Sequence, residues 1–101
     1  MTANELLAET HTGRMILEDV VKPLGMSVNA LAKELHIPAT RLNDIVRGQR
    51  GVTADTALRL ARHLGTTAQC WVNLQSAYER RVAERRKGPA IKKSVRPRKT
   101  A

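Results

Sequence analysis

Residues 27–47, SVNALAKELHIPATRLNDIVR, decide the fold of this chain, because they predict two short helices joined by a tight turn. In each half of the stretch, apolar residues recur at helical spacing and form one stripe. The stripes are Val28, Leu31, Ala32 and Leu35 in the first half, and Leu42, Ile45 and Val46 in the second. Two such stripes can face one core, so the stretch predicts a helix-turn-helix.

The turn between the two helices lies at His36-Ile37-Pro38. Proline has a fixed φ and no N–H, so Pro38 suits the first turn of a helix, where that N–H has no partner to lose. His36 ends the preceding helix, and we expect it to take the left-handed backbone conformation common at helix ends. Ser27 is a good N-cap, since its hydroxyl can accept a bond from a free backbone N–H.

The second helix of the pair carries a polar face that can reach base edges and phosphates in the major groove of DNA. Arg41 can pair with O6 and N7 of guanine, and Asn43 can pair with N6 and N7 of adenine. Thr40 suits a phosphate or a thymine methyl group, and Ala39 lies beside it at the exposed start of the helix. Asp44 would repel phosphate, so we expect it to pair with a neighbouring arginine. The alternative is that Arg41 and Asn43 are ordinary polar residues on a solvent-exposed helix face, with no contact to DNA.

Residues flanking this helix add candidate contacts to the phosphate backbone. Ser27 and Asn29 stand at a helix N-terminus, which attracts anions, although Ser27 also serves as a plain cap. Arg47 and Arg50 flank the turn at Gly48. Each of these arginines suits either a phosphate or the carbonyls at a helix C-terminus, and the sequence favours neither role.

The rest of the chain adds three helices and shows no strand signal, so the predicted fold class is all-α with five helices. We expect one helix over about residues 13–22, one over 54–64 capped by Thr53, and one from residue 68 onward capped by Thr67. The predicted core face of the fourth helix is Ala57, Leu58, Leu60, Ala61 and Leu64.

The last helix carries the chain's only tryptophan and only tyrosine, and the chain has no phenylalanine. Trp71, Leu74 and Tyr78 line one side of that helix at helical spacing. In so small a chain these rings offer the largest single burial of apolar surface. They therefore serve either the domain core or a dimer interface, and the dimer interface is at least as well supported.

The charge of the chain divides it into three parts: a lead-in at residues 1–12, a domain at 13–79 and a basic tail at 80–101. The formal net charge is +9. Residues 1–79 contain eight basic and eight acidic residues, whereas residues 80–101 contain ten basic residues and only Glu84. Gly88-Pro89 predicts a helix stop, and the composition beyond it favours disorder. The tail can be a solvated arm, a non-specific phosphate contact, or a segment that folds on an acidic partner.

Several classes of protein are disfavoured. No stretch has the roughly 18 apolar residues of a membrane span, so we expect a cytoplasmic protein with no membrane role. The single Cys70 has no base paired with it in the sequence, and the three histidines do not converge with it at ligand spacing. We therefore expect no catalytic residue, no metal site and no cofactor.

Beyond the helix-turn-helix, the segment GQRGVTADTALRLARHLGTTAQCWVNLQSAYE makes the chain resemble the HigA/VapI-type antitoxins, a branch of the phage-repressor-like (XRE) helix-turn-helix proteins. The resemblance covers roughly residues 11–79 and implies a lambda-repressor-like DNA-binding domain. The family pattern around the first helix is kept, except that Thr12 stands where proline is usual; the kept residues are His11, Gly13, Pro23, Leu24 and Gly25.

The resemblance implies a homodimer on palindromic operator DNA that represses its own operon. It also implies that the protein neutralises a small HigB-like ribonuclease toxin encoded beside it. The first alternative is a stand-alone repressor of the same fold with no toxin. The second is a protein-interaction scaffold with a basic arm for RNA, which the absence of aromatic stacking residues in the tail disfavours.

Overall fold

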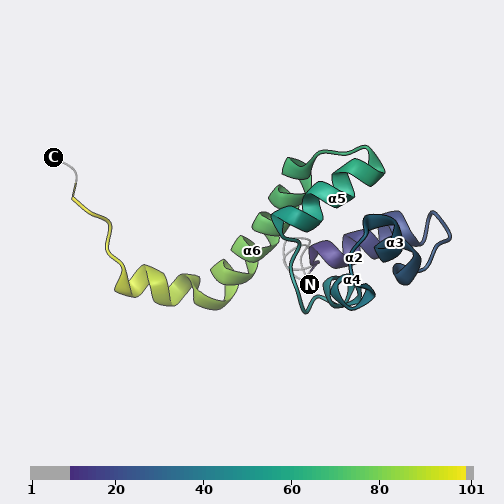
Figure 1. Ribbon diagram of the computed structural model, residues 1–101. Coiled ribbons are helices and arrows are strands. Elements are labelled where there is room, and N and C mark those ends of the chain that lie inside the picture. The colour runs from purple at the N-terminus through teal and green to yellow at the C-terminus, as the bar shows by residue number, and fades with distance from the viewer. Residues whose placement is uncertain (1–9, 100–101) are drawn as a thin grey trace.

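The computed structural model describes residues 10–99, and within that range the chain forms five helical segments and no strand. Figure 1 shows four of them gathered in a bundle with the first half of the fifth. The elements are α2 (Thr12–Ile16), continued by η1 (Leu17–Val21), α3 (Val28–Leu35), α4 (Ala39–Val46), α5 (Ala54–Leu64) and α6 (Ala68–Ser94). The predicted all-α fold with five helices is confirmed. Most of the predicted lead-in, residues 1–9, lies outside the described residues.

His11 caps the first helix, since its ring Nδ1 accepts a hydrogen bond from the backbone N–H of Arg14 at 3.1 Å. Its second half, η1, widens to π-helical bonding, since the N–H of Lys22 donates to the carbonyl of Leu17 at 3.0 Å. Gly13 lies against α4, where an added Cβ would overlap the carbonyl oxygen of Ile45. Only glycine allows these two helices to approach so closely.

The turn between α3 and α4 has the predicted geometry. Ser27 Oγ accepts from the N–H of Ala30 at 3.0 Å and caps α3. His36 has a φ of +57°, the left-handed value expected at this helix end, and Pro38 precedes the first residue of α4. The short turn fixes how α3 and α4 cross, which is the helix-turn-helix predicted from residues 27–47.

The core lies where the apolar stripes of all five segments meet. Its buried apolar residues are Ile16, Val20, Val21, Leu31, Ala32, Leu35, Ile37, Leu42, Ile45, Val52, Ala57, Leu60 and Trp71. One predicted core residue is wrong: Leu58 has 63% of its surface exposed. It lies about 100° around the helix from Ala57, outside the stripe that faces the core.

α5 and α6 begin with the predicted caps. The hydroxyl of Thr53 accepts from the N–H of Thr56 and that of Thr67 accepts from the N–H of Cys70. Gly65, with a φ of +70°, ends α5 as expected for a left-handed C-cap. The two helices pack along each other, and α6 also contacts α2.

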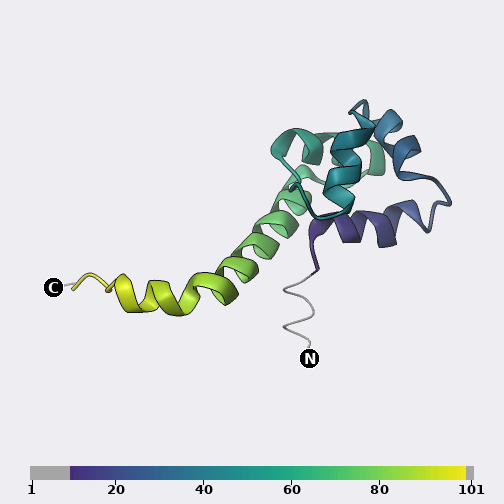
Figure 2. The ribbon, with the colours of Figure 1, turned by 90° about the horizontal axis from the view of Figure 1, so that it is seen from below.

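The predicted helix stop at Gly88-Pro89 is wrong, because α6 continues through Pro89 to Ser94. Residues 90–94, where the composition favours disorder, are therefore helical, and only 95–99 lack regular structure among the described part of the tail. Arginine, lysine, glutamate and alanine favour helix, and water can satisfy backbone groups that proline leaves without a donor. Figures 1 and 2 show α6 changing direction in this region, as proline causes in a helix.

Candidate DNA-binding surface

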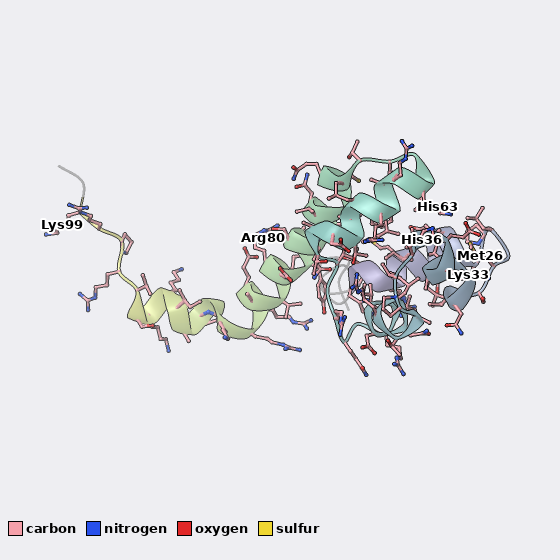
Figure 3. The ribbon with its side chains drawn as sticks, in the orientation of Figure 1. Met26, Lys33, His36, His63, Arg80 and Lys99 are labelled. Atoms are coloured by element: carbon pink, nitrogen blue, oxygen red, sulfur yellow. The ribbon has the colours of Figure 1, made fainter. Side chains whose placement is uncertain are left out.

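The polar face of α4 lies on the outside of the bundle, next to the start of α3. None of the eight predicted DNA-contacting side chains is buried. Arg41 and Asn43 are half-buried; the exposed residues of the set are Ser27, Asn29, Ala39, Thr40, Arg47 and Arg50. Figure 3 shows side chains extending from this part of the bundle, with His36 labelled at the turn between α3 and α4.

Arg41 is held by a carboxylate on the next helix. Its Nη1 donates to Oδ2 of Asp55 at 3.1 Å, and the same oxygen accepts from Nε of Arg59 at 2.9 Å. Nη1 of Arg59 donates in turn to the carbonyls of Leu35 and His36, at 3.1 and 3.2 Å. This chain of contacts connects the end of α3, α5 and α4, so the position of Arg41 depends on side chains outside its own helix.

The pKa of Asp55 follows from these contacts. The hydrogen bond from Arg59 lowers it first, and the charges of Arg59 and Arg41 act in the same direction against a desolvation effect that raises it. The carboxylate therefore stays ionised at neutral pH and remains an acceptor for both arginines.

Asn43 connects the two helices of the motif. Its Nδ2 donates to Oδ1 of Asn29 at 2.9 Å and to the carbonyl of Ala39 at 2.8 Å. The amide thus has a structural role between α3 and α4. To pair with adenine through both its oxygen and its nitrogen, Asn43 must give up one of these two N–H bonds, because pairing with N7 of adenine takes one amide N–H.

Asp44 pairs with arginine, as predicted. Oδ1 of Asp44 accepts from Nη2 of Arg47 at 3.0 Å, and its Oδ2 lies 4.0 Å from Nη2 of Arg50. The two arginines therefore converge on one acid at the end of α4. A carboxylate between two guanidinium groups reduces their local positive charge without removing it, since two cations face one anion.

A hollow of about 320 Å³ lies between α4 and the start of α5. Three arginine side chains surround it together with one carboxylate; its lining is Arg41, Arg50, Gly51, Thr53, Asp55, Thr56 and Arg59. The hollow opens beside the polar face of α4, so cationic groups lie along the margin of the candidate DNA-binding surface.

Two residues of this surface, Asp55 and Arg59, were not among the predicted contacts. Their spacing of four residues on one helix is a signal for an ion pair. Nothing in the sequence, however, connects that pair to Arg41, which lies fourteen residues away from Asp55 along the chain. Only the packing of α5 against the motif brings them together.

The three predicted dimer-interface residues have different environments. Trp71 is only 7% exposed and its Nε1 donates to Oγ1 of Thr66 at 2.8 Å, so its ring belongs to the core of its own chain. Of the two roles that the sequence left open for Trp71, core or dimer interface, the structure therefore shows the core. Leu74 is half-buried against the core, and Tyr78 is half-buried with its ring 6.2 Å from that of His11.

No three histidine, cysteine or acidic side chains within residues 10–99 converge as metal ligands do. None of the helices in that range combines the length and the apolar character needed to cross a bilayer.

Comparison with known proteins agrees with this geometry. The model of the family described as "Helix-turn-helix" matches residues 17–69. Virulence-associated protein I of Dichelobacter nodosus is 52% identical over 84 residues, which cover 83% of this chain and 77% of that protein.

Two solved structures share both fold and sequence. An addiction module antidote protein of a HigA family from Coxiella burnetii is 45% identical, with a TM-score of 0.83 over 88% of this chain and 97% of that one. Pseudomonas aeruginosa antitoxin HigA, solved with the higBA promoter, is 40% identical, with a TM-score of 0.84 over 87% and 96% of the two chains. The family consists of DNA-binding antitoxins and regulators, not enzymes. This chain therefore belongs to the HigA family of helix-turn-helix proteins.

Proposed function

We propose that this protein is a sequence-specific DNA-binding antitoxin that represses its own operon and neutralises a HigB-like ribonuclease toxin. The observation that carries the DNA-binding part is the outward polar face of α4, presented beside the start of α3. The major groove is wide enough to admit one helix carrying such side chains. A role on DNA also places the protein in the cytoplasm, where a bacterial operator lies.

Arg41 and Asn43 read bases in this proposal, and the residues around them contact phosphates. Arg41 either exchanges its contact with Asp55 for a contact with guanine, or keeps the contact with Asp55, which then orients its guanidinium group toward the base. The free N–H groups at the start of α3 serve a phosphate next to Ser27 and Asn29. Arg47, Arg50 and Thr40 face the backbone on the other side of α4, and Ala39 allows close approach because its side chain is small.

A homodimer would present two copies of α4 to one duplex. We place the dimer contact along α6, at Leu74 and Tyr78, because these two side chains are only half-buried in the single chain. A two-fold dimer uses the same patch on both subunits and binds a palindrome. Its half-sites should lie about one helical turn, roughly 34 Å, apart.

A binding assay on the DNA upstream of the protein's own reading frame tests the DNA-binding part. Loss of one bidentate base contact costs about 1–3 kcal/mol, so Arg41→Ala and Asn43→Ala should each weaken binding roughly 5- to 150-fold and relax base preference at one position. Arg62→Ala, an exposed arginine on α5, is the matched control. Unchanged affinity and unchanged base preference in both α4 variants would refute the proposal.

Co-expression with the adjacent reading frame tests the antitoxin part. If the neighbour is a toxin, its expression alone should stop growth, and this chain should restore growth and purify with it. A stand-alone repressor predicts operator binding with no toxic neighbour and no co-purified partner. The two experiments are independent, so DNA binding can hold while toxin neutralisation fails.

A further inference from the structure

The basic arm, residues 80–99, carries all of the excess positive charge of the molecule. It contains ten arginine and lysine residues and one acid, Glu84. Glu84 pairs with Arg80 at 2.9 Å. None of these residues belongs to the polar face of α4, so the base and phosphate contacts proposed above leave the charge of the arm without a role.

The arm begins beside the loop that follows α4. Gln75 of α6 accepts the backbone N–H of Val52 at 3.0 Å. A hollow of about 190 Å³ is lined by Gly48, Gln49, Arg50 and Gly51 on one side and by Gln75, Tyr78 and Glu79 on the other, with residues 11–13. Arg80 is the next residue of the helix. The cationic margin at Arg50 is therefore close to the start of the arm.

From that point the arm extends away from the bundle, as Figure 3 shows between the labels Arg80 and Lys99. Its helical part, 80–94, is about 20 Å long at 1.5 Å per residue. This length matches about six base pairs of duplex at 3.4 Å each. A duplex that contacts α4 and Arg50 and continues along the direction of α6 would therefore bring phosphates within reach of the arm.

The surface of the arm suits phosphates and does not suit an apolar partner. Its basic residues occur on all sides of the helix, and its few apolar residues form no continuous stripe. Ile91, the largest of them in the helix, is 50% exposed. A partner that recognises charge density without requiring an apolar face is a nucleic acid backbone.

We propose that the basic arm binds phosphates of duplex DNA beside the segment read by α4, without regard to base sequence. The inference rests on DNA binding by this protein, which it deepens. Its contribution is to affinity and salt dependence, whereas α4 supplies base preference. Each phosphate that the arm neutralises steepens the fall of log affinity with log salt by about 0.9.

The test compares Arg86→Gln/Lys87→Gln in the arm with Lys22→Gln/Arg62→Gln in the bundle. Both variants lose one arginine and one lysine, and all four residues are exposed. Binding of the full-length proteins is measured by fluorescence anisotropy from low to high salt. The probes are the upstream DNA, a duplex of the same length with shuffled sequence, and a single-stranded RNA of that length.

The inference predicts that the arm variant has a salt slope at least about 0.9 shallower than that of the bundle variant on both duplexes. The ratio of its affinities for the upstream and shuffled duplexes should stay that of the wild type. A smaller difference in slope between the two variants overturns the inference. A loss of affinity in the arm variant that is confined to the RNA probe overturns it as well. Loss of the affinity ratio in Arg41→Ala, with its shuffled-duplex binding retained, separates the α4 proposal from the arm. Absence of binding to either duplex at every salt concentration would overturn both.

Discussion

The bundle and the basic arm are both helical, but different forces account for them. The helices of the bundle pack their apolar stripes around one core, and close contacts such as that of Gly13 with α4 fix how the helices lie against each other. The arm contributes no residue to the core and consists mainly of exposed residues, many of them charged, on a helix that ends at Ser94. Burial therefore determines shape in one region, while charge determines the possible partner in the other. Substitutions should affect stability in the bundle and salt-dependent binding in the arm.

The largest expected effect on stability comes from removing a buried side chain. Leu42 of α4 is fully buried, so Leu42→Ala should lower the free energy of unfolding by about 2–5 kcal/mol. Ile91→Ala in the arm removes a similar volume from an exposed position and should change it by less than about 0.5 kcal/mol. Urea unfolding followed by circular dichroism measures both. Equal losses would show that the arm packs on the bundle, and the comparison would fail.

A pair of glycines gives the next largest effect. Gly13→Ala places a Cβ against the carbonyl of Ile45 and forces α2 and α4 apart, which should cost about 1–3 kcal/mol. Gly88→Ala adds a Cβ where no atom lies within 4 Å, and alanine favours helix over glycine by up to about 1 kcal/mol. Helical circular dichroism of Gly88→Ala should therefore rise slightly. If the urea midpoint of Gly13→Ala equals that of the wild type, α2 and α4 are not in the close contact that Gly13 makes with Ile45.

A third comparison sharpens the role of the contacts around Arg41. Arg59→Gln removes hydrogen bonds to Asp55 and to the carbonyls that end α3, so it should lower the unfolding free energy by about 1 kcal/mol. It should also change base preference, because Asp55 then loses its contact with Arg59 and accepts a hydrogen bond from Arg41 only. Arg62→Gln, one turn further along α5 and exposed, should change neither. Base preference unchanged in Arg59→Gln would show that base reading by Arg41 does not depend on Arg59.

The features of the bundle that sequence predicts best are those set by neighbouring residues. The caps at Ser27, Thr53 and Thr67 and the left-handed His36 each depend on contacts or backbone angles within a few positions, and all are confirmed. The core stripes follow from helical periodicity, and the prediction was wrong at Leu58 because that residue lies outside the stripe that faces the core. Local rules therefore determine most of this small fold.

The contacts that sequence could not predict connect helices far apart in the chain. Arg41 meets Asp55, and Asn43 meets Asn29, only because α3, α4 and α5 cross at fixed angles. The stop at Gly88-Pro89 was wrong for a different reason: proline disrupts one turn, but exposed neighbours with high helix propensity continue the helix beyond it. The contact of the eight predicted residues of the α3–α4 surface with DNA stays a prediction.

The smallest expected effect concerns pH and the start of α2. Burial lowers the pKa of His11, and the charge of Arg14 lowers it further, so the folded state favours the neutral ring whose Nδ1 accepts the N–H of Arg14. The unfolded chain then binds more protons, and stability is present above the ordinary histidine pKa of about 6.5 and is lost as pH falls through the lower folded value. The melting temperature should therefore decrease slightly between pH 7 and 5. His11→Asn keeps a capping oxygen without a titrating ring and should flatten that decrease, whereas His63→Asn on the exposed face of α5 should retain it. An unchanged pH dependence in His11→Asn would mean that the α2 cap does not respond to protonation of this ring.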